Sequence, residues 1–344
     1  MYTTHPYLQR RWDTVGRSLA FLSQGQADWD GWRRKTIQTL KELSGYNSMQ
    51  PAPLNPKITE VVQFDDYTRQ RVEIQTEPQI TMPLYVLIPT SARPPYPAVI
   101  APHGHSSGGK LAVTGCRDIP EIRETIDQHN YDYGMQFVKA GFITFCPDAR
   151  GFGERQEAAA KGNILASSCQ WLNNMAYPLG QTVTGMWTWD LHRLVDYIHS
   201  RPDCRADQIG CAGLSGGGLQ TLWATALDER IRCSVISGYL YGYKESLLDA
   251  HTNCSCNYVP HLYEYVDMGD IAALIAPRPL LVETGSKDPL NGASGLENVY
   301  SQMKIIRTVY RLLGAESRLT HDVFEGDHRW HGLKAIPWMK RFLT

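Results

Sequence analysis

Residues 207–228 read Asp-Gln-Ile-Gly-Cys-Ala-Gly-Leu-Ser-Gly-Gly-Gly-Leu-Gln-Thr-Leu-Trp-Ala-Thr-Ala-Leu-Asp, and this stretch decides the fold. A short apolar run leads into Gly-Leu-Ser-Gly-Gly at 213–217, and apolar residues at helical spacing follow. The pattern predicts a strand, a sharp turn with Ser215 at its apex, and a helix. Glycine suits positions 213 and 217, because a side chain there would collide with a neighbouring strand or helix. The helix N-terminus beside Ser215 would favour a developing oxyanion.

Composition and charge narrow the class of protein. The chain has 344 residues, 42% apolar and 20% charged, which is typical of a soluble globular protein. Its 34 basic and 35 acidic side chains give a net charge of −1, so nothing favours nucleic acid or an anionic membrane. The first residues lack the apolar core of a signal peptide. We therefore expect a cytoplasmic protein whose eight cysteines are reduced.

The order of expected elements indicates an α/β fold. Residues 6–46 carry amphipathic helical patterns interrupted near Gly25, and 47–56 contain three prolines. We predict an N-terminal helical extension and linker at 1–56, followed by a catalytic domain at 57–344. Strands are expected at 58–64, 71–75, 82–88, 98–101, 142–146, 209–212, 231–236, 280–283 and 319–324.

Helices fall between most of these strands. They are expected at 131–140, 184–200, after the serine, at 296–313 and at 330–342. Strand–helix alternation after two antiparallel strands predicts a doubly wound, mostly parallel sheet. Residues 156–182 show no clear period, which is typical of a lid over a site. The N-terminal helices would pack on the main domain or bind a partner. The sequence does not decide whether the protein forms a homo-oligomer.

A nucleophilic serine needs a base and a group that orients the base. The serine turn is the nucleophile elbow of α/β-hydrolases, in which the acid and then the histidine follow the serine. Asp288 comes directly after the strand at 280–283 and is preferred over Glu283, which lies within it. A plain turn residue before proline is the other interpretation of Asp288.

Three histidines remain for the base. His321 falls within the last strand, His328 lies on the loop after it, and His331 is expected one turn into the last helix. We prefer His328 over His331, because catalytic groups sit on loops at strand ends. The remaining interpretation of the serine motif is a glycine-rich turn without chemistry.

Other residues are candidates for binding. The oxyanion would be held by the backbone N–H groups of Gly216 and His105. The predicted substrate-binding residues are His103, Trp171 and Tyr239, since flat rings suit sugar faces. Trp187 is expected in the core.

Two sets of residues have the composition of a metal site. They are His103 with His105, and His251 with Cys254, Cys256 and His261. The first set has a ligand spacing, but no carboxylate or cysteine nearby completes it. The order and spacing of the second set do not match the usual C-x2-C type, so we interpret it as pocket wall or packing. We expect no metal and no cofactor. Asp148 and Arg150 are interpreted as a structural ion pair that supports the site.

Six separated motifs together resemble one family. They are Pro102-His-Gly-His, Asp148-Ala-Arg-Gly-Phe-Gly-Glu-Arg155, Gly213-Leu-Ser-Gly-Gly217, Cys254-Ser-Cys-Asn-Tyr-Val-Pro260, Gly285-Ser-Lys-Asp-Pro289 and Gly326-Asp-His328. Over roughly 58–344 the chain is similar to the bacterial acetyl xylan esterase-like and dienelactone-hydrolase-like α/β-hydrolases. The resemblance implies a serine esterase with Ser215, Asp288 and His328 in the catalytic positions. It departs from true dienelactone hydrolases, which use a cysteine nucleophile.

The predicted function is that of a serine carboxylic ester hydrolase acting on a small-molecule or carbohydrate ester, with short acyl groups such as acetyl preferred. An amidase or peptidase of the same fold is one alternative. The chain has no propeller-sized N-terminal domain, which argues against a prolyl-oligopeptidase type. The other alternative is a catalytically silent fold used for binding.

Overall fold

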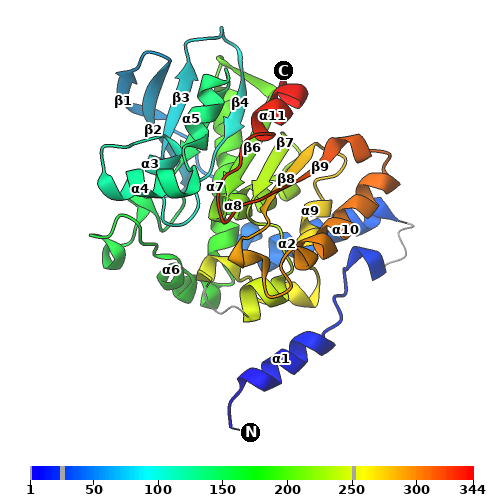
Figure 1. Ribbon diagram of the computed structural model, residues 1–344. Coiled ribbons are helices and arrows are strands. Elements are labelled where there is room, and N and C mark those ends of the chain that lie inside the picture. Colours follow the sequence, from blue (N-terminus) through cyan, green and yellow to red (C-terminus); the bar gives the residue numbers. More distant parts are fainter. Residues whose placement is uncertain (1, 24–27, 250–252) are drawn as a thin grey trace.

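A nine-stranded sheet forms the centre of the described part of the protein (Figure 1). The computed structural model describes residues 2–23, 28–249 and 253–344. The strand order is β1-β2-β3-β5-β4-β6-β7-β8-β9, antiparallel from β1 to β5 and parallel from there to β9. The strands are β1 (Lys57–Gln63), β2 (Tyr67–Glu77), β3 (Ile80–Pro89), β4 (Tyr96–Ile100), β5 (Ile143–Pro147), β6 (Cys204–Leu214), β7 (Ile231–Ser237), β8 (Leu280–Gly285) and β9 (Leu319–Phe324).

Helices cover both faces of this sheet. The α-helices of the described residues are α1 (His5–Thr14), α2 (Trp29–Leu43), α3 (Lys110–Val113), α4 (Pro120–His129), α5 (Tyr133–Lys139), α6 (Cys169–Ala176), α7 (Val183–Ser200), α8 (Gly216–Leu227), α9 (Met268–Ala273), α10 (Leu296–Leu312) and α11 (Ala335–Leu343). Successive strand residues point to opposite faces. Val99 of β4 therefore packs in a core with α5 and α11, whereas Ala98 and Ile100 pack in a core with α7. The predicted doubly wound, mostly parallel sheet is confirmed.

The N-terminal segment differs from the helical prediction. Helix α1 ends at Thr14, and residues 15–20 are not helical. The amides of Ser18 and Leu19 instead donate to the carbonyls of Glu264 and Tyr265 at 3.0 and 2.9 Å, so tertiary hydrogen bonds replace helical ones. Gly25 lies outside the described residues.

The two N-terminal helices pack differently. Helix α2 buries Trp32 and Leu40 in the main core, whereas α1 buries no residue and extends away from the body (Figure 1). Trp12 of α1 contacts the ring of Tyr263, with centroids 4.4 Å apart. The domain boundary and the oligomeric state stay predictions.

Two other segments also differ from expectation. The region 156–182, predicted to have no regular structure, contains α6. The last helix begins at Ala335 rather than at residue 330. Trp330 is drawn away from a helical path because its amide donates to the carbonyl of His129 at 2.9 Å, and Gly332 has a φ of 74°. Among the described residues, no helix has both the length and the apolar character needed to cross a bilayer.

Candidate active site

Ser215 occupies the junction between β6 and α8. Its φ of 60° and ψ of −120° are strained for a residue with a side chain, and such strain is typical of functional sites. The flanking glycines are required by contact. A Cβ on Gly213 would lie 2.5 Å from the carbonyl carbon of Gly217, and one on Gly217 would lie 2.2 Å from the oxygen of Pro102. This backbone therefore presents the serine at the tip of the turn, as the sequence predicts.

His328 and Asp288 form a hydrogen-bonded pair. Nδ1 of His328 lies 2.7 Å from Oδ2 of Asp288, which is buried. The other carboxylate oxygen of Asp288 accepts the amide of Leu290 at 2.9 Å, so the carboxylate is held from both sides. A proton on Nδ1 leaves Nε2 of His328 available as a base.

One cavity of about 960 Å³ connects the candidate residues. Ser215, Gly216, His105, Tyr239 and His328 all line it, with Asp288 behind His328. Strands β4, β6, β7 and β9 all end next to loops that line this cavity, which is where open parallel sheets bind ligands.

The alternative base, His331, and the alternative acid, Glu283, take other roles. Nδ1 of His331 lies 2.8 Å from Oδ2 of Asp322, and its ring stacks on Phe324. Glu283 is fully buried in β8 and accepts the amide of Gly332 at 3.0 Å. Burial raises the pKa of the Glu283 carboxyl to about 7. Neither His331 nor Glu283 is among the described residues that line the cavity.

Both candidate oxyanion donors lie close together. A Cβ on Gly104 would come within 3.1 Å of the nitrogen of Gly216 and 2.3 Å of the hydroxyl of Tyr131, so glycine allows the two loops to approach. Neither Gly216 nor His105 donates its amide to a backbone carbonyl of a described residue. An oxyanion requires N–H donors beside the nucleophile, so the roles of Gly216 and His105 stay predictions.

Two predicted substrate-binding residues lie elsewhere. His103 is buried: Nε2 accepts the amide of Ala149 at 3.1 Å, and Nδ1 donates to the carbonyl of Gly104 at 2.9 Å. Burial lowers the pKa of its imidazole to about 4, so His103 is a neutral residue that joins two loops. Trp171 is 47% exposed on α6 and does not line the cavity among the described residues, although its neighbour Gln170 does.

Tyr239 lies where a substrate-binding residue could act, and its role stays a prediction, whereas the predicted core position of Trp187 is confirmed. Tyr239 lines the cavity and donates its hydroxyl to Oδ1 of Asn257 at 2.8 Å. Trp187 is buried in the core.

The predicted pair of Asp148 with Arg150 is wrong, because each binds a different partner. Asp148 accepts Nζ of Lys110 at 2.5 Å, and both side chains are buried. Arg150 binds Asp190 and Glu77. Sequence reasoning missed Lys110, which follows two glycines directly after the loop with His105. That position next to a site loop is the signal that could have identified it.

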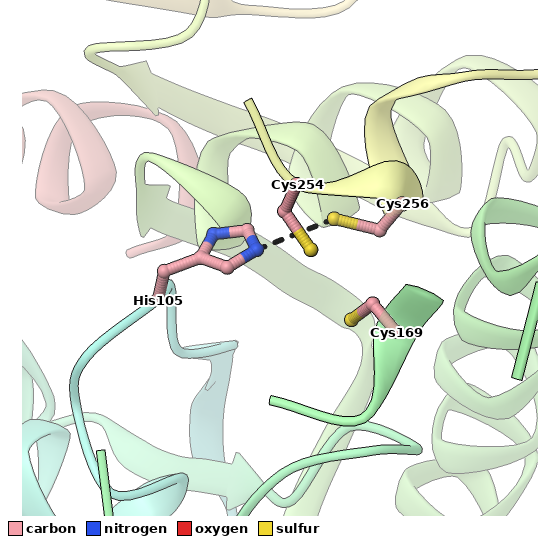
Figure 2. Close-up of side chains that lie close together, drawn as sticks. All are labelled: His105, Cys169, Cys254 and Cys256. Atoms are coloured by element: carbon pink, nitrogen blue, oxygen red, sulfur yellow. Dashed lines mark hydrogen bonds between the residues drawn. The ribbon is translucent and has the colours of Figure 1, made fainter. Parts of the chain in front are cut away.

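One histidine and three cysteines cluster beside the cavity (Figure 2), and two of them, His105 and Cys254, line it. One ligand atom from each of His105, Cys169, Cys254 and Cys256 lies within 4.8 Å of all the others. The sequence analysis grouped Cys254 and Cys256 with His251 and His261, which are not part of this cluster. His261 is exposed and pairs with Glu264, and His251 lies outside the described residues.

Fold and site together define an α/β-hydrolase. The chain belongs to the Abhydrolase family, which matches residues 17–319. It is 30% identical over 234 residues to "Putative hydrolase YtaP" of Bacillus subtilis, covering 65% of this chain and 71% of that protein. The recognised family and the hydrolase class are therefore confirmed.

Solved structures show the same fold. A "putative acetyl xylan esterase" from Bacteroides fragilis superposes with a TM-score of 0.82 at 16% identity, covering 99% of this chain and 95% of that one. A glucuronoyl esterase from Solibacter usitatus superposes with a TM-score of 0.67 at 17% identity, covering 95% and 97%. Acetyl xylan esterase 1 from Thermoanaerobacterium superposes with a TM-score of 0.60 at 18% identity, covering 98% and 99%.

Proposed function

We propose that this protein is a serine esterase that cleaves carboxylic esters through an acyl-enzyme. The observation that carries the proposal is the His328–Asp288 pair at 2.7 Å on the same cavity as the strained Ser215. Nε2 of His328 takes the proton of Ser215 as its Oγ attacks the ester carbonyl. Asp288 holds the imidazole in the tautomer that this transfer needs.

The remaining steps of the cycle use the same groups. The N–H groups of Gly216 and His105 bind the oxyanion of each tetrahedral intermediate. His328 then protonates the leaving alcohol, and a water molecule activated by the same imidazole releases the acid from Ser215. No step requires a cofactor.

The natural substrate in this proposal is a carbohydrate that carries a short acyl group. A cavity of about 960 Å³ is much larger than an acetyl group and leaves room for a sugar as the alcohol. Its wall combines Tyr239 and Tyr241 with polar side chains such as Asn253 and Asn257, which suits rings that carry hydroxyls. The names of the acetyl xylan esterases and glucuronoyl esterase of the same fold support this substrate class. None of the eight cysteines, all of which the structure describes, is in a disulfide, which fits a reducing compartment, so we place the protein in the cytoplasm.

A labelling experiment with a substrate series tests this proposal. Wild-type protein and Ser215→Ala are treated with a fluorophosphonate probe and mapped by peptide mass spectrometry. We expect label on Ser215, turnover of p-nitrophenyl acetate that falls as the acyl chain lengthens, and loss of both in a folded Ser215→Ala protein. Full ester turnover by Ser215→Ala would refute the nucleophile.

Further substrates separate the alternatives. Acetylated xylo-oligosaccharides, methyl glucuronate and an aminoacyl anilide are compared at equal concentration. Preference for the anilide would move the assignment to an amidase. Preference for the methyl ester would place the sugar on the acyl side of the bond. Absence of label and of turnover would support a binding protein.

A further inference from the structure

The ligand cluster at the cavity wall comes from three separate segments. His105 lies on the loop after β4, Cys169 is the first residue of α6, and Cys254 and Cys256 flank the start of a short 3-10 helix at Ser255–Asn257. Figure 2 shows the imidazole and the three sulfur atoms pointing toward a common centre. We propose that these four residues form a zinc site.

The distances fit tetrahedral coordination. Ligand sulfurs about 2.3 Å from zinc lie about 3.8 Å from each other in a regular tetrahedron. The four ligand atoms here are all within 4.8 Å of one another, and Nε2 of His105 lies 3.3 Å from Sγ of Cys256. The four ligand atoms are therefore already close to the spacing that one ion requires. Three thiolates and one imidazole are the donors that zinc prefers, and they close its coordination as in a structural site.

Neighbouring polar groups support the ligands. Nδ2 of Asn257 is 3.8 Å from Sγ of Cys256, and the hydroxyl of Tyr239 fixes Asn257 from the other side. The hydroxyl of Ser167 lies 3.7 Å from Sγ of Cys254. The hydroxyl of Thr184 donates to the carbonyl of Cys256 at 2.6 Å. Donors to thiolate sulfur and anchors on the ligand backbone are the usual surroundings of a metal centre.

A disulfide is the competing use of the same cysteines. One disulfide would engage two sulfurs and leave the third thiol and the imidazole of His105 without a role. Zinc uses all four groups. The other five cysteines of the chain lie in other positions of the fold, four of them buried on strands, so they do not share this arrangement.

The site has a structural consequence for the cavity. Zinc on Nε2 of His105 leaves the imidazole proton on Nδ1. That nitrogen faces the backbone beside the nucleophile, since a Cβ built on Gly216 would lie 2.9 Å from it. One ion would thus tie the loop after β4, the start of α6 and the 254–256 segment into a single wall. Loss of the ion is expected to lower thermal stability, because metal binding energy adds to folding energy.

Metal content provides the test, and it is measured without any assay of activity. The full chain is purified under reducing conditions without a polyhistidine tag, and zinc is counted by mass spectrometry. We expect about one zinc per chain in the wild type and in the control Cys116→Ser, whose cysteine lies outside the cluster. Cys254→Ser and Cys256→Ser should each lose at least about tenfold in zinc affinity, measured by competition with a chromophoric chelator.

A second measurement covers variants that fail to fold, which circular dichroism would reveal. Wild-type protein is stripped of zinc and refilled with Co²⁺. Thiolate-to-cobalt charge transfer with tetrahedral visible bands is expected, and it should disappear after the thiols are alkylated. Wild-type protein that takes up neither Zn²⁺ nor Co²⁺ would overturn the proposal. Undiminished binding by a folded Cys256→Ser, or a stable disulfide between two of the three sulfurs after purification under reducing conditions, would also overturn it.

Discussion

Replacing Asp288 with asparagine tests the assignment of the triad through the tautomer of His328. In the wild type, Oδ1 of Asp288 accepts the amide of Leu290 at 2.9 Å, and Oδ2 faces Nδ1 of His328 at 2.7 Å. In Asp288→Asn the carboxamide oxygen must keep the amide of Leu290, because a donor there would face another donor. The NH₂ group then faces Nδ1 and forces it to accept. The proton of the imidazole moves to Nε2, which can no longer take the proton of Ser215.

The expected loss is large and confined to turnover. The same carboxylate-to-amide change in a Ser-His-Asp triad lowers kcat by about 10⁴-fold, which is about 5.5 kcal/mol of transition-state stabilisation. Ground-state binding involves other residues of the cavity, so KM should stay close to its wild-type value. Folding should be preserved, since both hydrogen bonds of residue 288 have a replacement.

The assay is steady-state hydrolysis of p-nitrophenyl acetate, with thermal unfolding followed in parallel. Asp322→Asn is the matched control, because Asp322 pairs with His331 at 2.8 Å in the same manner, outside the cavity. We expect the control to keep wild-type kcat. If Asp288→Asn retains more than about a tenth of wild-type kcat, Asp288 does not orient the base and the reasoning is wrong.

Two further predictions concern buried charge. The pKa of Glu283 is raised by burial from 4.5 to about 7, so its contribution to stability is complete below pH 4.5 and is lost as the pH rises through 7. This loss amounts to about 3 kcal/mol. The free energy of unfolding in urea should therefore differ less between pH 5 and pH 8 for Glu283→Gln than for the wild type. Equal differences in the two proteins would contradict the assignment. Lys110→Met leaves the buried carboxylate of Asp148 without its cation and should cost about 3–5 kcal/mol in urea unfolding. Lys287→Met, which removes an exposed pair with Glu325, should change stability by less than about 1 kcal/mol, and similar losses in both variants would refute the importance of burial.

Local patterns were enough to predict the parts of the site that depend on chain order. Ser215, Asp288 and His328 each follow a strand that has a clear apolar run, so their positions at one edge of the sheet follow from topology. His103 was misassigned for a different reason. The sequence places it next to His105 on the same loop. Its burial and its hydrogen bond with the amide of Ala149 depend on a segment far away in the chain, and its bond with the carbonyl of Gly104 depends on the geometry of the turn.

Contacts between distant segments were beyond the sequence. The spacing of Cys254 and Cys256 was visible, but their partners Cys169 and His105 come from positions 85 and more residues earlier in the chain. Nothing in local composition links α6 to this loop. The same holds for the N-terminal stretch 15–20, where hydrogen bonds to residues 264 and 265 replace the helix that its periodicity predicts.

The buried pair of Lys110 and Asp148 connects these observations to function. Such a pair is seldom more stable than apolar side chains of equal volume, so stability alone does not account for it. Asp148 also accepts the amides of Lys110 and Glu154, at 2.8 and 3.1 Å, and therefore holds two loops with one carboxylate. One of these loops carries His105, whose amide is a proposed oxyanion donor and whose ring is a proposed zinc ligand. A group that must bind an oxyanion gains most from being fixed before the reaction starts, because no reorganisation is then needed in the transition state. We infer that the buried pair of Lys110 and Asp148 and the proposed zinc site both serve to fix the loop after β4.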